Sequence, residues 1–386
     1  MSGRGRYLMG ALLLAALVGA MAYWFWPAPQ PRESLAVGSA LSGGDDAGYQ
    51  RAYAPRPFDF PADHGPHPEF RTEWWYVTGN LSDTGGRPFG YQLTLFRIAL
   101  APTSPPADSA WRANQIYMGH FALTDVTGQK HHAFERFSRG AMGLAGARAV
   151  PFRVWLEDWS LSGAESDAFP LRVLARQEGI ALDLTLTAAK PVVLQGDQGL
   201  SQKSAEPGNA SYYYSHTRLP TEGAIQLAEK TFKVSGASWL DREWSTSALG
   251  PEQSGWDWFA LQLDDGRDLM FYRLRRKDGS VDAHSKGALV AADGQVRLLS
   301  HSEVELQPTG EWRSPVSGDR YPAGWRLRVP AEKLELTITP KLADQELRLR
   351  VRYWEGAVAI SGRAGDAKIS GQGYLEMTRY EPPINP

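Results

Sequence analysis

Apolar and polar residues alternate strictly along several short stretches of this chain, and this pattern constrains its fold more than any other feature. The alternation is clear in Ile180–Thr187, in Leu334–Thr339 and in Glu346–Arg352. A period of two places alternate side chains on opposite faces of a β-strand. After residue 50, no long stretch of the sequence shows the 3.6-residue apolar period of an amphipathic helix. The chain is therefore predicted to be all-β.

Turn-forming residues separate these stretches. Turn signals occur at Asp83–Gly86, at the Asp-Gly pairs 265–266, 278–279 and 293–294, and at Ser361–Gly362. Such pairs between alternating runs are typical of tight β-hairpins. Many short antiparallel strands joined in this way predict β-sandwiches or β-barrels. The turns alone do not determine whether the sheets close.

An internal repeat indicates two β-domains. Trp75-Tyr76 is followed by Leu81, Asp83, a glycine turn and a strand-like run to Phe96-Arg97, and Trp258-Phe259 is followed by Leu263, Asp265, Gly266 and a run with Tyr272-Arg273. Self-similarity of this kind suggests duplication of one structural unit. We predict an N-terminal domain over residues 53–245 and a C-terminal domain over residues 246–386.

The first 26 residues predict a membrane segment. Arg4 and Arg6 precede the uncharged stretch Tyr7–Trp26, which as a helix would rise about 30 Å, the thickness of the bilayer core. The basic residues predict that the folded part is exported to the periplasmic side of the inner membrane. The aromatic residues that end the stretch favour an uncleaved signal anchor, whereas Ala20–Ala22 is compatible with a cleaved signal peptide. Residues 27–52, rich in Pro, Gly, Ser and Ala, are predicted to be a linker.

Charge and cysteine content exclude several classes of function. The chain has 41 Lys and Arg against 43 Asp and Glu, and its net charge of −2 provides no excess that could neutralise the phosphates of a nucleic acid. The absence of cysteine excludes disulfides, thiol catalysis, iron–sulfur clusters and zinc sites with thiolate ligands. The sequence also contains no Gly-x-Ser-x-Gly motif, which marks the nucleophile of α/β-hydrolases.

One segment at the start of the predicted N-terminal domain carries an unusual motif. Residues 58–81 read FDFPADHGPHPEFRTEWWYVTGNL and precede the run that ends at Phe96-Arg97. This segment resembles the opening of the AttH/CrtC family, which includes the carotenoid 1,2-hydratases. The matching positions are Pro61, Asp63, His64, His67, Pro68, Glu73, Trp74, Trp75, Tyr76, Gly79, Leu81, Phe96 and Arg97, and later family-like elements include His120, Asp125, Tyr213–Ser215, Gly236–Trp244 and Gly255–Phe259. The resemblance covers residues 57–386 and implies a tandem of two lipocalin-like β-barrels.

The resemblance implies two functional classes, of which the first is enzymatic. A hydratase of this kind protonates a terminal isoprenoid double bond, stabilises the carbocation with aromatic side chains and adds water without a cofactor. Trp239-Leu240-Asp241 is similar to the segment that carries the proton donor, so the expected catalytic residues are Asp241, Trp239 and Tyr214. In a strand, Trp239 and Asp241 point to the same face. The chain departs from the hydratases at Tyr212–Tyr214, where they look to have a histidine.

The second class is a binding function. AttH-like members look like exported proteins that bind a hydrophobic small molecule alongside an ABC-type transport system. The aromatic residues expected to line the ligand pocket are Trp74, Tyr76, Trp244, Trp256 and Trp258. We expect binding of a lipid or isoprenoid, with an ABC permease as a partner, and hydration of an isoprenoid as the alternative. Neither function requires a cofactor or a metal ion.

Several charged residues allow both a structural and a functional interpretation. Asp63, His64, His67 and Glu69 are close enough in sequence for a metal site, but Pro66 and Pro68 in the same loop favour a rigid scaffold. Glu73 is expected to be a buried partner of Arg97 or Arg71, or else part of an active site. Asp241 and Glu243 form either an acid site or an ion-pair network between the barrels. We assign to a structural motif Asp63, His64, His67, Glu73, Arg97 and His120.

Overall fold

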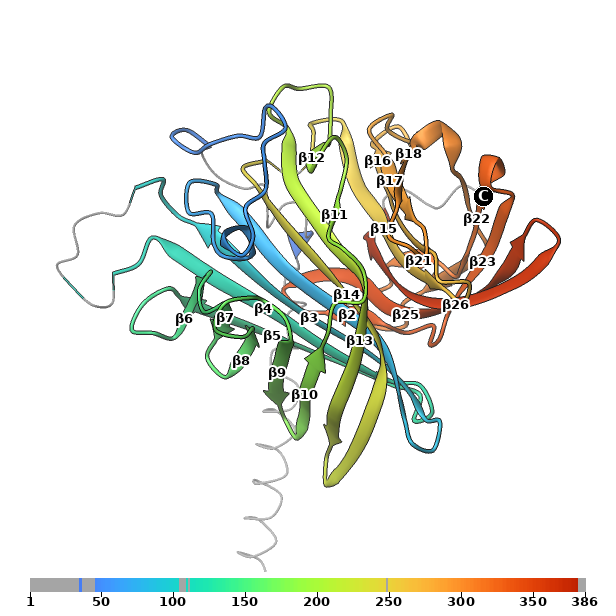
Figure 1. Cartoon of the computed structure of the whole chain (residues 1–386), viewed down its shortest axis with the longest axis horizontal. Helices are drawn as coiled ribbons and strands as arrows, with labels where there is room; N and C mark the ends of the chain where they lie inside the picture. The colour runs from blue at the N-terminus through green and yellow to red at the C-terminus, as the bar shows by residue number, and fades with distance from the viewer. Residues whose placement is uncertain (1–34, 37–45, 104–108, 110–111, 248, 381–386) are drawn as a thin grey trace, which may run out of the picture. The chain divides into compact units, whose positions relative to one another are not determined.

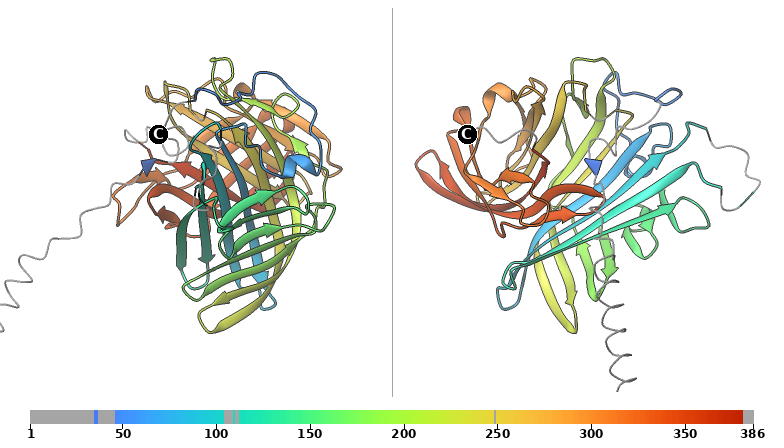
Figure 2. Two further views of the ribbon diagram at one scale, coloured as in Figure 1. Left: turned by 90° about the vertical axis from the view of Figure 1, so that its left-hand side faces the viewer. Right: turned by 180° about the vertical axis from the view of Figure 1, so that it is seen from behind.

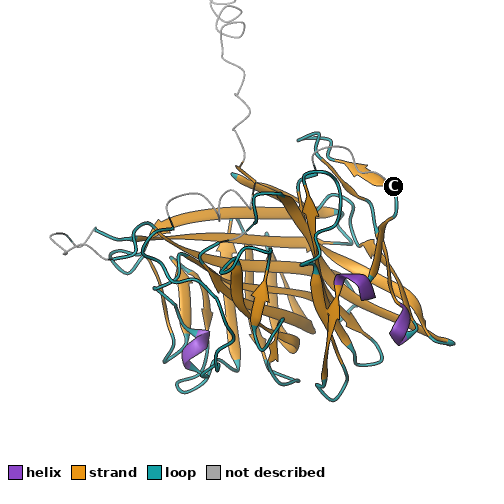
Figure 3. Ribbon diagram, turned by 90° about the horizontal axis from the view of Figure 1, so that it is seen from above, coloured by secondary structure: helices purple, strands orange, loops and turns teal. Residues whose placement is uncertain are grey.

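The computed structural model describes residues 35–36, 46–103, 109, 112–247 and 249–380 of the chain. The predicted membrane segment 1–26 and most of the predicted linker 27–52 lie outside these residues. No helix in the described part is long and apolar enough to cross a membrane. The helices of this part are the single 3₁₀ turns η1 (Ala62–His64), η2 (His301–Glu303) and η3 (Pro330–Glu332) (Figure 3). The fold is therefore all-β, as the alternation predicts.

Most of the first half of the chain forms one antiparallel sheet of 13 strands (Figure 1). Its strands are β2 (Thr72–Asp83), β3 (Pro88–Ala99), β4 (Gln115–Asp125), β5 (Lys130–Arg139), β6 (Ala145–Arg148), β7 (Arg153–Leu156), β8 (Trp159–Ser162), β9 (Leu171–Gln177), β10 (Ile180–Leu186), β11 (Val193–Leu194), β12 (Leu200–Gln202), β13 (Ala210–Leu227) and β14 (Lys230–Ser245). Their order is β5-β4-β3-β2-β14-β13-β10-β9-β8-β7-β6, with β11 and β12 paired to β13. The sheet curls into a nearly closed barrel. Arg136 of the edge strand β5 reaches across to the other side of the barrel, where it donates to Gln177 Oε1 of β9 at 2.6 Å.

The second sheet has 11 strands and is built from the remainder of the chain. Its strands are β15 (Gln253–Leu263), β16 (Asp268–Arg276), β17 (Lys286–Val290), β18 (Val296–Ser300), β19 (Glu305–Pro308), β22 (Trp325–Val329), β23 (Leu334–Pro340), β24 (Glu346–Arg348), β25 (Val351–Ala364), β26 (Ala367–Thr378) and the short β1 (Leu35–Ala36). The order is β18-β17-β16-β15-β26-β25-β23-β22-β19, with β1 and β24 paired to β25. A separate hairpin consists of β20 (Glu311–Arg313) and β21 (Arg320–Pro322).

The two sheets repeat one strand order. In each sheet the first four long strands form a meander, and the first of them pairs with the last strand of that sheet, β2 with β14 and β15 with β26. The two copies of the sequence repeat lie on β2 and β15. The first sheet ends at Ser245 and the meander of the second begins at Gln253. Residues 35–386 nevertheless form one compact unit.

Two local predictions differ from the structure. Ser361-Gly362 lies inside β25 rather than in a turn, and a Cβ atom at Gly362 would collide with the carbonyl oxygen of Glu335 on β23. The run Glu346–Arg352 is a tight hairpin rather than one strand, because β24 folds back on β25 with Arg348 opposite Arg352. Arg348 and Arg350 of this run are exposed, whereas the Glu346 carboxylate is buried and accepts hydrogen bonds from Ser314 and Ser317.

Each sheet encloses its own apolar core, and a further cluster lies between the sheets. On β2, Trp75 and Val77 belong to the core of the first sheet, whereas Tyr76 belongs to the cluster between the sheets. The outer faces of β2, β3 and β13 contact β26, β25 and β15 of the second sheet (Figure 2). Strands such as β2 therefore have two buried faces, and the face that points away from the core of the first sheet lies at the site.

Candidate active site

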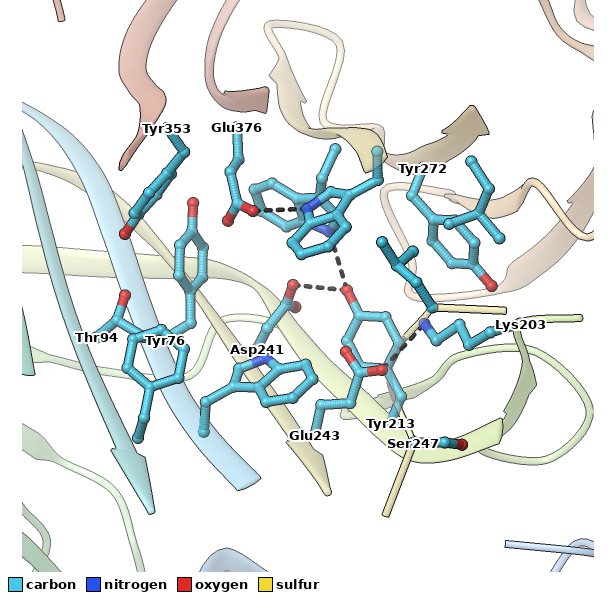
Figure 4. Close-up of a pocket in the computed structure, with 16 residues that line it drawn as sticks. Tyr76, Thr94, Lys203, Tyr213, Asp241, Glu243, Ser247, Tyr272, Tyr353 and Glu376 are labelled. Carbon is cyan, nitrogen blue, oxygen red and sulfur yellow. Dashed lines mark hydrogen bonds and ion pairs between the residues drawn. The ribbon is translucent and has the colours of Figure 1, made fainter. Parts of the chain in front are cut away.

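A cavity of about 110 Å³ lies between the outer faces of the two sheets (Figure 4). Strands β2, β3, β13 and β14 contribute side chains from the first sheet, and β15, β16, β25 and β26 from the second. Its walls are mainly aromatic: Trp74, Tyr76, Phe96, Tyr213, Trp256, Trp258, Tyr272 and Tyr353. Among the described lining residues, the charged ones are Lys203, Asp241, Glu243 and Glu376. The cavity is thus an apolar space with a few acidic groups on its walls, as in many small-molecule sites.

Asp241 is held on the cavity wall by three neutral hydrogen-bond donors. Its Oδ1 accepts from Ser215 Oγ at 2.6 Å and from Trp239 Nε1 at 2.7 Å, and its Oδ2 accepts from the Tyr213 hydroxyl at 2.6 Å. The residue is 4% exposed. Burial raises the pKa of Asp241 to about 7, although the three donors favour the ionised form. Asp241 can therefore hold a proton near neutral pH.

Strand pairing explains how these groups meet. Ser215 and Tyr213 lie on β13 opposite Asp241 and Glu243 of β14, and directly paired residues share a face of the sheet. Trp258 of the second sheet donates its Nε1–H to the Tyr213 hydroxyl at 3.1 Å. The chain Trp258–Tyr213–Asp241 fixes the orientation of the carboxyl group from both sheets.

A second acidic group faces the same cavity from the opposite sheet. Glu376 Oε1 accepts a hydrogen bond from Trp256 Nε1 at 2.6 Å. Burial raises the pKa of Glu376 to about 7. Figure 4 shows the carboxyl groups of Asp241 and Glu376 pointing into the same space from different sheets. Behind Glu376, the carboxyl of Glu355 accepts from the Tyr76 hydroxyl at 2.7 Å, and burial holds the pKa of Glu355 well above its usual range.

The charged pair Lys203–Glu243 forms another part of the wall. Lys203 Nζ lies 2.9 Å from Glu243 Oε1 and 4.3 Å from the centre of the Tyr272 ring. Burial opposes the charge of Lys203, but Glu243 and Tyr272 raise its pKa above the usual value. This amine is therefore a cation rather than a nucleophile for Schiff-base chemistry. Glu243 belongs to an ion pair, in contrast to Asp241 on the same face of β14.

The structure places some of the residues that we expected at the pocket on the cavity wall and others elsewhere. Trp74, Tyr76, Trp256 and Trp258 line the cavity together with Asp241. Trp239 lies beside it, in the cluster between the sheets, and bonds Asp241.

Tyr214 and Trp244 require a correction, because both belong to the core of the first sheet. Trp244 is three residues from Asp241 on β14 and so faces the other way. The Tyr214 hydroxyl is hydrogen-bonded to His64 Nδ1 at 2.6 Å, and Tyr213 takes the place that we expected for Tyr214.

Of the residues assigned to a structural motif, Asp63, His67, Glu73 and Arg97 belong to a buried charge network on the inner face of the first sheet. Glu73 is fully buried, forms ion pairs with Arg97 and Arg242, and accepts a hydrogen bond from the backbone N–H of His67. Although burial opposes ionisation, Arg242 and Arg97 hold the pKa of Glu73 far below its usual range. The Arg242 guanidinium also lies 4.0 Å from the centre of the Trp75 ring. Of the two partners expected for Glu73, the structure shows Arg97, while Arg71 pairs with Asp46 at 3.0 Å.

The histidines of the motif are also engaged in structural contacts. His67 Nε2 lies 3.0 Å from Asp63 Oδ1, and the His67 ring stacks on Trp244 at 3.8 Å. His120 Nδ1 lies 2.8 Å from the hydroxyl of Tyr353, linking the two sheets near the cavity. Within the described part of the chain, no group of three or more His, Asp or Glu side chains could hold a metal ion.

Several residues around Asp241 were not expected at the pocket. Tyr213–Ser215 resembles the family in sequence, but only the register of β13 on β14 shows that Ser215 and Tyr213 meet Asp241. Glu376 and Lys203 have no motif of their own, and they line the cavity because the second sheet and the loop after β12 pack on the first sheet. Glu355 lies behind Glu376.

A second hollow, of about 650 Å³, opens where the β4–β5, β9–β10 and β13–β14 turns come together. Its lining includes Lys130, His131, His132, Phe134 and Glu178, and none of the residues expected at a pocket. Of its two acidic residues, Asp125 is neutralised by Arg87. The aromatic cavity between the sheets is therefore the better candidate for chemistry.

Comparisons with known proteins agree with this architecture. A family model described as AttH-like matches residues 51–380. A Nitrosomonas europaea protein described as an AttH has a solved structure that is 36% identical, covers 84% of this chain and 99% of its own, and has a TM-score of 0.74. Kievitone hydratase from Nectria haematococca shares the fold at 15% identity, with 91% of this chain and 97% of its own covered and a TM-score of 0.65. CghA in complex with Sch210972 shares it at 14% identity, with 90% and 98% covered and a TM-score of 0.55. No curated protein matches the chain. The chain belongs to the AttH-like family.

Proposed function

We propose that the cavity between the sheets binds a hydrophobic, unsaturated small molecule and that Asp241 protonates it, so that water adds across a carbon–carbon double bond without a cofactor. The observation that carries this proposal is the environment of Asp241. It is a buried carboxyl group that faces an aromatic cavity, and its described hydrogen-bond partners are the neutral donors Ser215, Trp239 and Tyr213. A pKa near 7 lets such a group act as a general acid at neutral pH.

The aromatic wall supports the same chemistry. Protonation of an alkene leaves a carbocation, and the faces of Trp and Tyr rings attract cations by roughly 0.5–2 kcal/mol each in a dry site. Trp74, Trp256 and Trp258 line the cavity around Asp241. Several rings together still fall short of the ~8 kcal/mol that enzymes supply at minimum, so positioning of the double bond against Asp241 must provide much of the remainder.

A pure carrier function is the competing proposal, because the same aromatic cavity would retain a lipid or isoprenoid without chemistry. The acidic groups favour catalysis, since a carrier for an apolar ligand gains nothing from placing carboxyl groups with raised pKa values on its wall. The name of kievitone hydratase is consistent with hydration chemistry on this fold, but that similarity supports the fold alone.

The test uses the full chain in detergent. Organic extraction and mass spectrometry first identify any bound ligand. The protein is then incubated with lycopene and with geraniol in ¹⁸O-labelled water, and the label in the alcohol product is measured. We expect turnover by the wild type and a roughly 10²–10⁴-fold loss in Asp241→Asn, which keeps the size of the side chain but cannot donate the acid proton.

Asp293→Asn is the matched control, because Asp293 lies exposed in the turn between β17 and β18. Turnover that survives in Asp241→Asn contradicts the assignment of the acid. A bound lipid without turnover of either probe supports the carrier function instead.

We also propose that the protein is exported and acts with a membrane partner. The basic and apolar N-terminus supports placement on the periplasmic side of the inner membrane, where the protein would act alongside an ABC permease. Each sheet would form a lipocalin-like barrel, which is consistent with the repeated strand order. A reporter fusion at the C-terminus tests the location, and co-purification of a permease from membranes tests the partner.

A further inference from the structure

The structure places an unexpected pair of carboxyl groups beside the cavity. Glu355 of β25 and Glu376 of β26 lie directly opposite each other in the strand pair, so their side chains leave the same face of the sheet. Glu355 is fully buried, whereas Glu376 reaches the cavity wall. The second sheet thus carries its own pair of carboxyl groups, separate from Asp241 on the first sheet.

The surroundings of this pair favour a proton on one of the two carboxyl groups. Glu355 Oε1 accepts from the Tyr76 hydroxyl at 2.7 Å, and Glu376 Oε1 accepts from Trp256 Nε1 at 2.6 Å. Glu355 Oε2 is buried and receives no N–H or O–H donor from other described residues. Two buried carboxylates at facing positions repel each other when both are ionised, so we expect the pair to hold a proton.

We infer that Glu376 is a second catalytic residue of this cavity, the base that takes the proton from the attacking water, and that Glu355 is a positioning residue that acts through Glu376. The inference rests on the proposed hydration. It assigns the two halves of the reaction to the two sheets, with the acid on β14 and the base on β26.

The charges around Glu376 suit this role. It faces Glu355 on β25, Tyr76 on β2 and Trp256 on β15, and the acidic residues Asp241 and Glu243 on β14. Lys203 neutralises Glu243, so the groups that compete for protons are the other three carboxyls. Burial and the neighbouring Glu376 raise the pKa of Glu355 well above its usual range. Glu355 therefore keeps its proton.

Asp241 and Glu376 then compete for one further proton, because repulsion disfavours ionisation of both groups. Near neutral pH, one of the two is therefore an acid while the other is a base.

The reaction balances with the proton on Asp241. The Asp241 carboxyl gives its proton to one alkene carbon, which forms a C–H bond and leaves a cation on the other carbon. The oxygen of a water molecule bonds to that cation as the Glu376 carboxylate removes one of its protons. The product is an alcohol, Asp241 is left ionised and Glu376 protonated, and exchange of a proton with solvent restores the starting state.

An infrared pH titration tests the shared proton without any substrate. We expect the full-length wild type to keep a protonated-carboxyl band at pH 8.5 and Glu355→Gln to lose it. Glu346→Gln is the matched control, because Glu346 is a buried glutamate that is paired with Arg348 at 3.0 Å and should not contribute to the band. Absence of the band in the wild type, or its persistence in Glu355→Gln, overturns the inference.

Kinetics with lycopene and geraniol test the catalytic role. We expect Glu376→Gln to lose roughly 10²-fold or more in turnover while the Kd for the terpenoid changes less than about threefold, since apolar contacts dominate binding. Glu355→Gln should retain turnover, because its amide N–H replaces the shared proton. Glu355→Met has a similar size but no donor, and it should move the acidic limb of the pH profile to higher pH. A merely structural role of Glu355 would lower turnover without moving that limb.

The outcomes separate this inference from the proposed function. Wild-type turnover that is unchanged in Glu376→Gln overturns the inference and leaves the role of Asp241 intact. A wild type that converts neither terpenoid overturns the proposed function, and the catalytic role of Glu376 with it. Loss in Glu376→Gln, together with the shifted limb in Glu355→Met, supports the inference.

Discussion

Strands β2 and β14 bury carboxyl groups on both of their faces, and two of these groups, Glu73 and Asp241, behave in opposite ways. On the inner face, Glu73 is ionised between Arg97 and Arg242, and these arginines lower its pKa. On the outer face, Asp241 meets neutral donors and its pKa is raised to about 7. Both groups are buried, so burial alone does not decide the charge state.

The difference shows which of the two groups is available for proton transfer. The Glu73 proton is lost throughout the physiological pH range, and its lone pairs are occupied by arginine and backbone donors. Its network resembles the buried ion pairs that specify a structure. Asp241 lies on a cavity and can change protonation state near neutral pH. The inner face is a scaffold and the outer face is the candidate site.

The largest expected effect is a loss of stability when the buried charge network around Glu73 is changed. Glu73→Gln removes the charge between Arg97 and Arg242, which remain buried, and should lower the free energy of unfolding by about 3–5 kcal/mol. Urea unfolding followed by tryptophan fluorescence measures this change. Glu335→Gln is the control, since Glu335 pairs with Arg328 at 3.0 Å on an exposed surface and should cost less than about 1 kcal/mol. Equal effects of the two substitutions would contradict the scaffold interpretation.

The next effect concerns the dependence of stability on pH. The pKa of Asp241 is about 7 in the folded chain against an ordinary 3.8, so between these values the folded state holds more protons than the unfolded state. This contribution to stability is complete below pH 3.8 and is lost as the pH rises through 7. At pH 8, we expect the free energy of unfolding of Asp241→Asn to exceed that of the wild type by about 2–4 kcal/mol.

Denaturation series at pH 5 and pH 8 check the sign of this prediction. The gain of Asp241→Asn should be much smaller at pH 5, where wild-type Asp241 is already neutral. A variant that is less stable than the wild type at pH 8 would show that Asp241 is ionised and satisfied, like Glu73.

The smallest effect compares two neighbouring tyrosines. Tyr213→Phe removes one donor from Asp241 and should raise the pKa of that carboxyl further, by about one unit for a hydrogen bond worth roughly 1 kcal/mol. Tyr214→Phe is a matched control that removes a hydroxyl bonded to His64 instead. Infrared titration of the Asp241 carboxyl measures both variants. A shift in Tyr214→Phe equal to that in Tyr213→Phe would contradict the separation of the two faces.

Much of the fold could be predicted from the sequence. Alternation of period two identified strands such as β10 and β23, whose burial alternates residue by residue. The repeat of Trp75-Tyr76 in Trp258-Phe259 found the first strand of each meander. Asp241 with Trp239 was also predictable, because two residues on one strand at a spacing of two share a face. These signals are local, so the linear order of residues contains them.

The Trp244 prediction is wrong because side chains alternate between the two faces of a strand. Trp244 is an odd number of residues from Asp241, so a single strand must place the two on opposite faces. The Tyr214 prediction shows a limit of a different kind. An unbroken hairpin from the β13–β14 turn would place Tyr214 opposite Glu243. A β-bulge between His216 and Leu219 shifts the register by one residue, so that Tyr213 lies opposite Glu243 instead.

The sequence by itself determined the all-β class, the duplicated hairpins and one acid on a predictable strand face, because each depends on spacing along the chain. Only the tertiary structure decided which tyrosine meets Asp241, since a bulge exchanges the faces of a strand. Only the packing of the second sheet brought Glu376 to the cavity wall, with Glu355 behind it. Residues more than 100 positions apart have no local signal of their proximity, and the charge of a buried carboxyl depends on the neighbours that the fold provides.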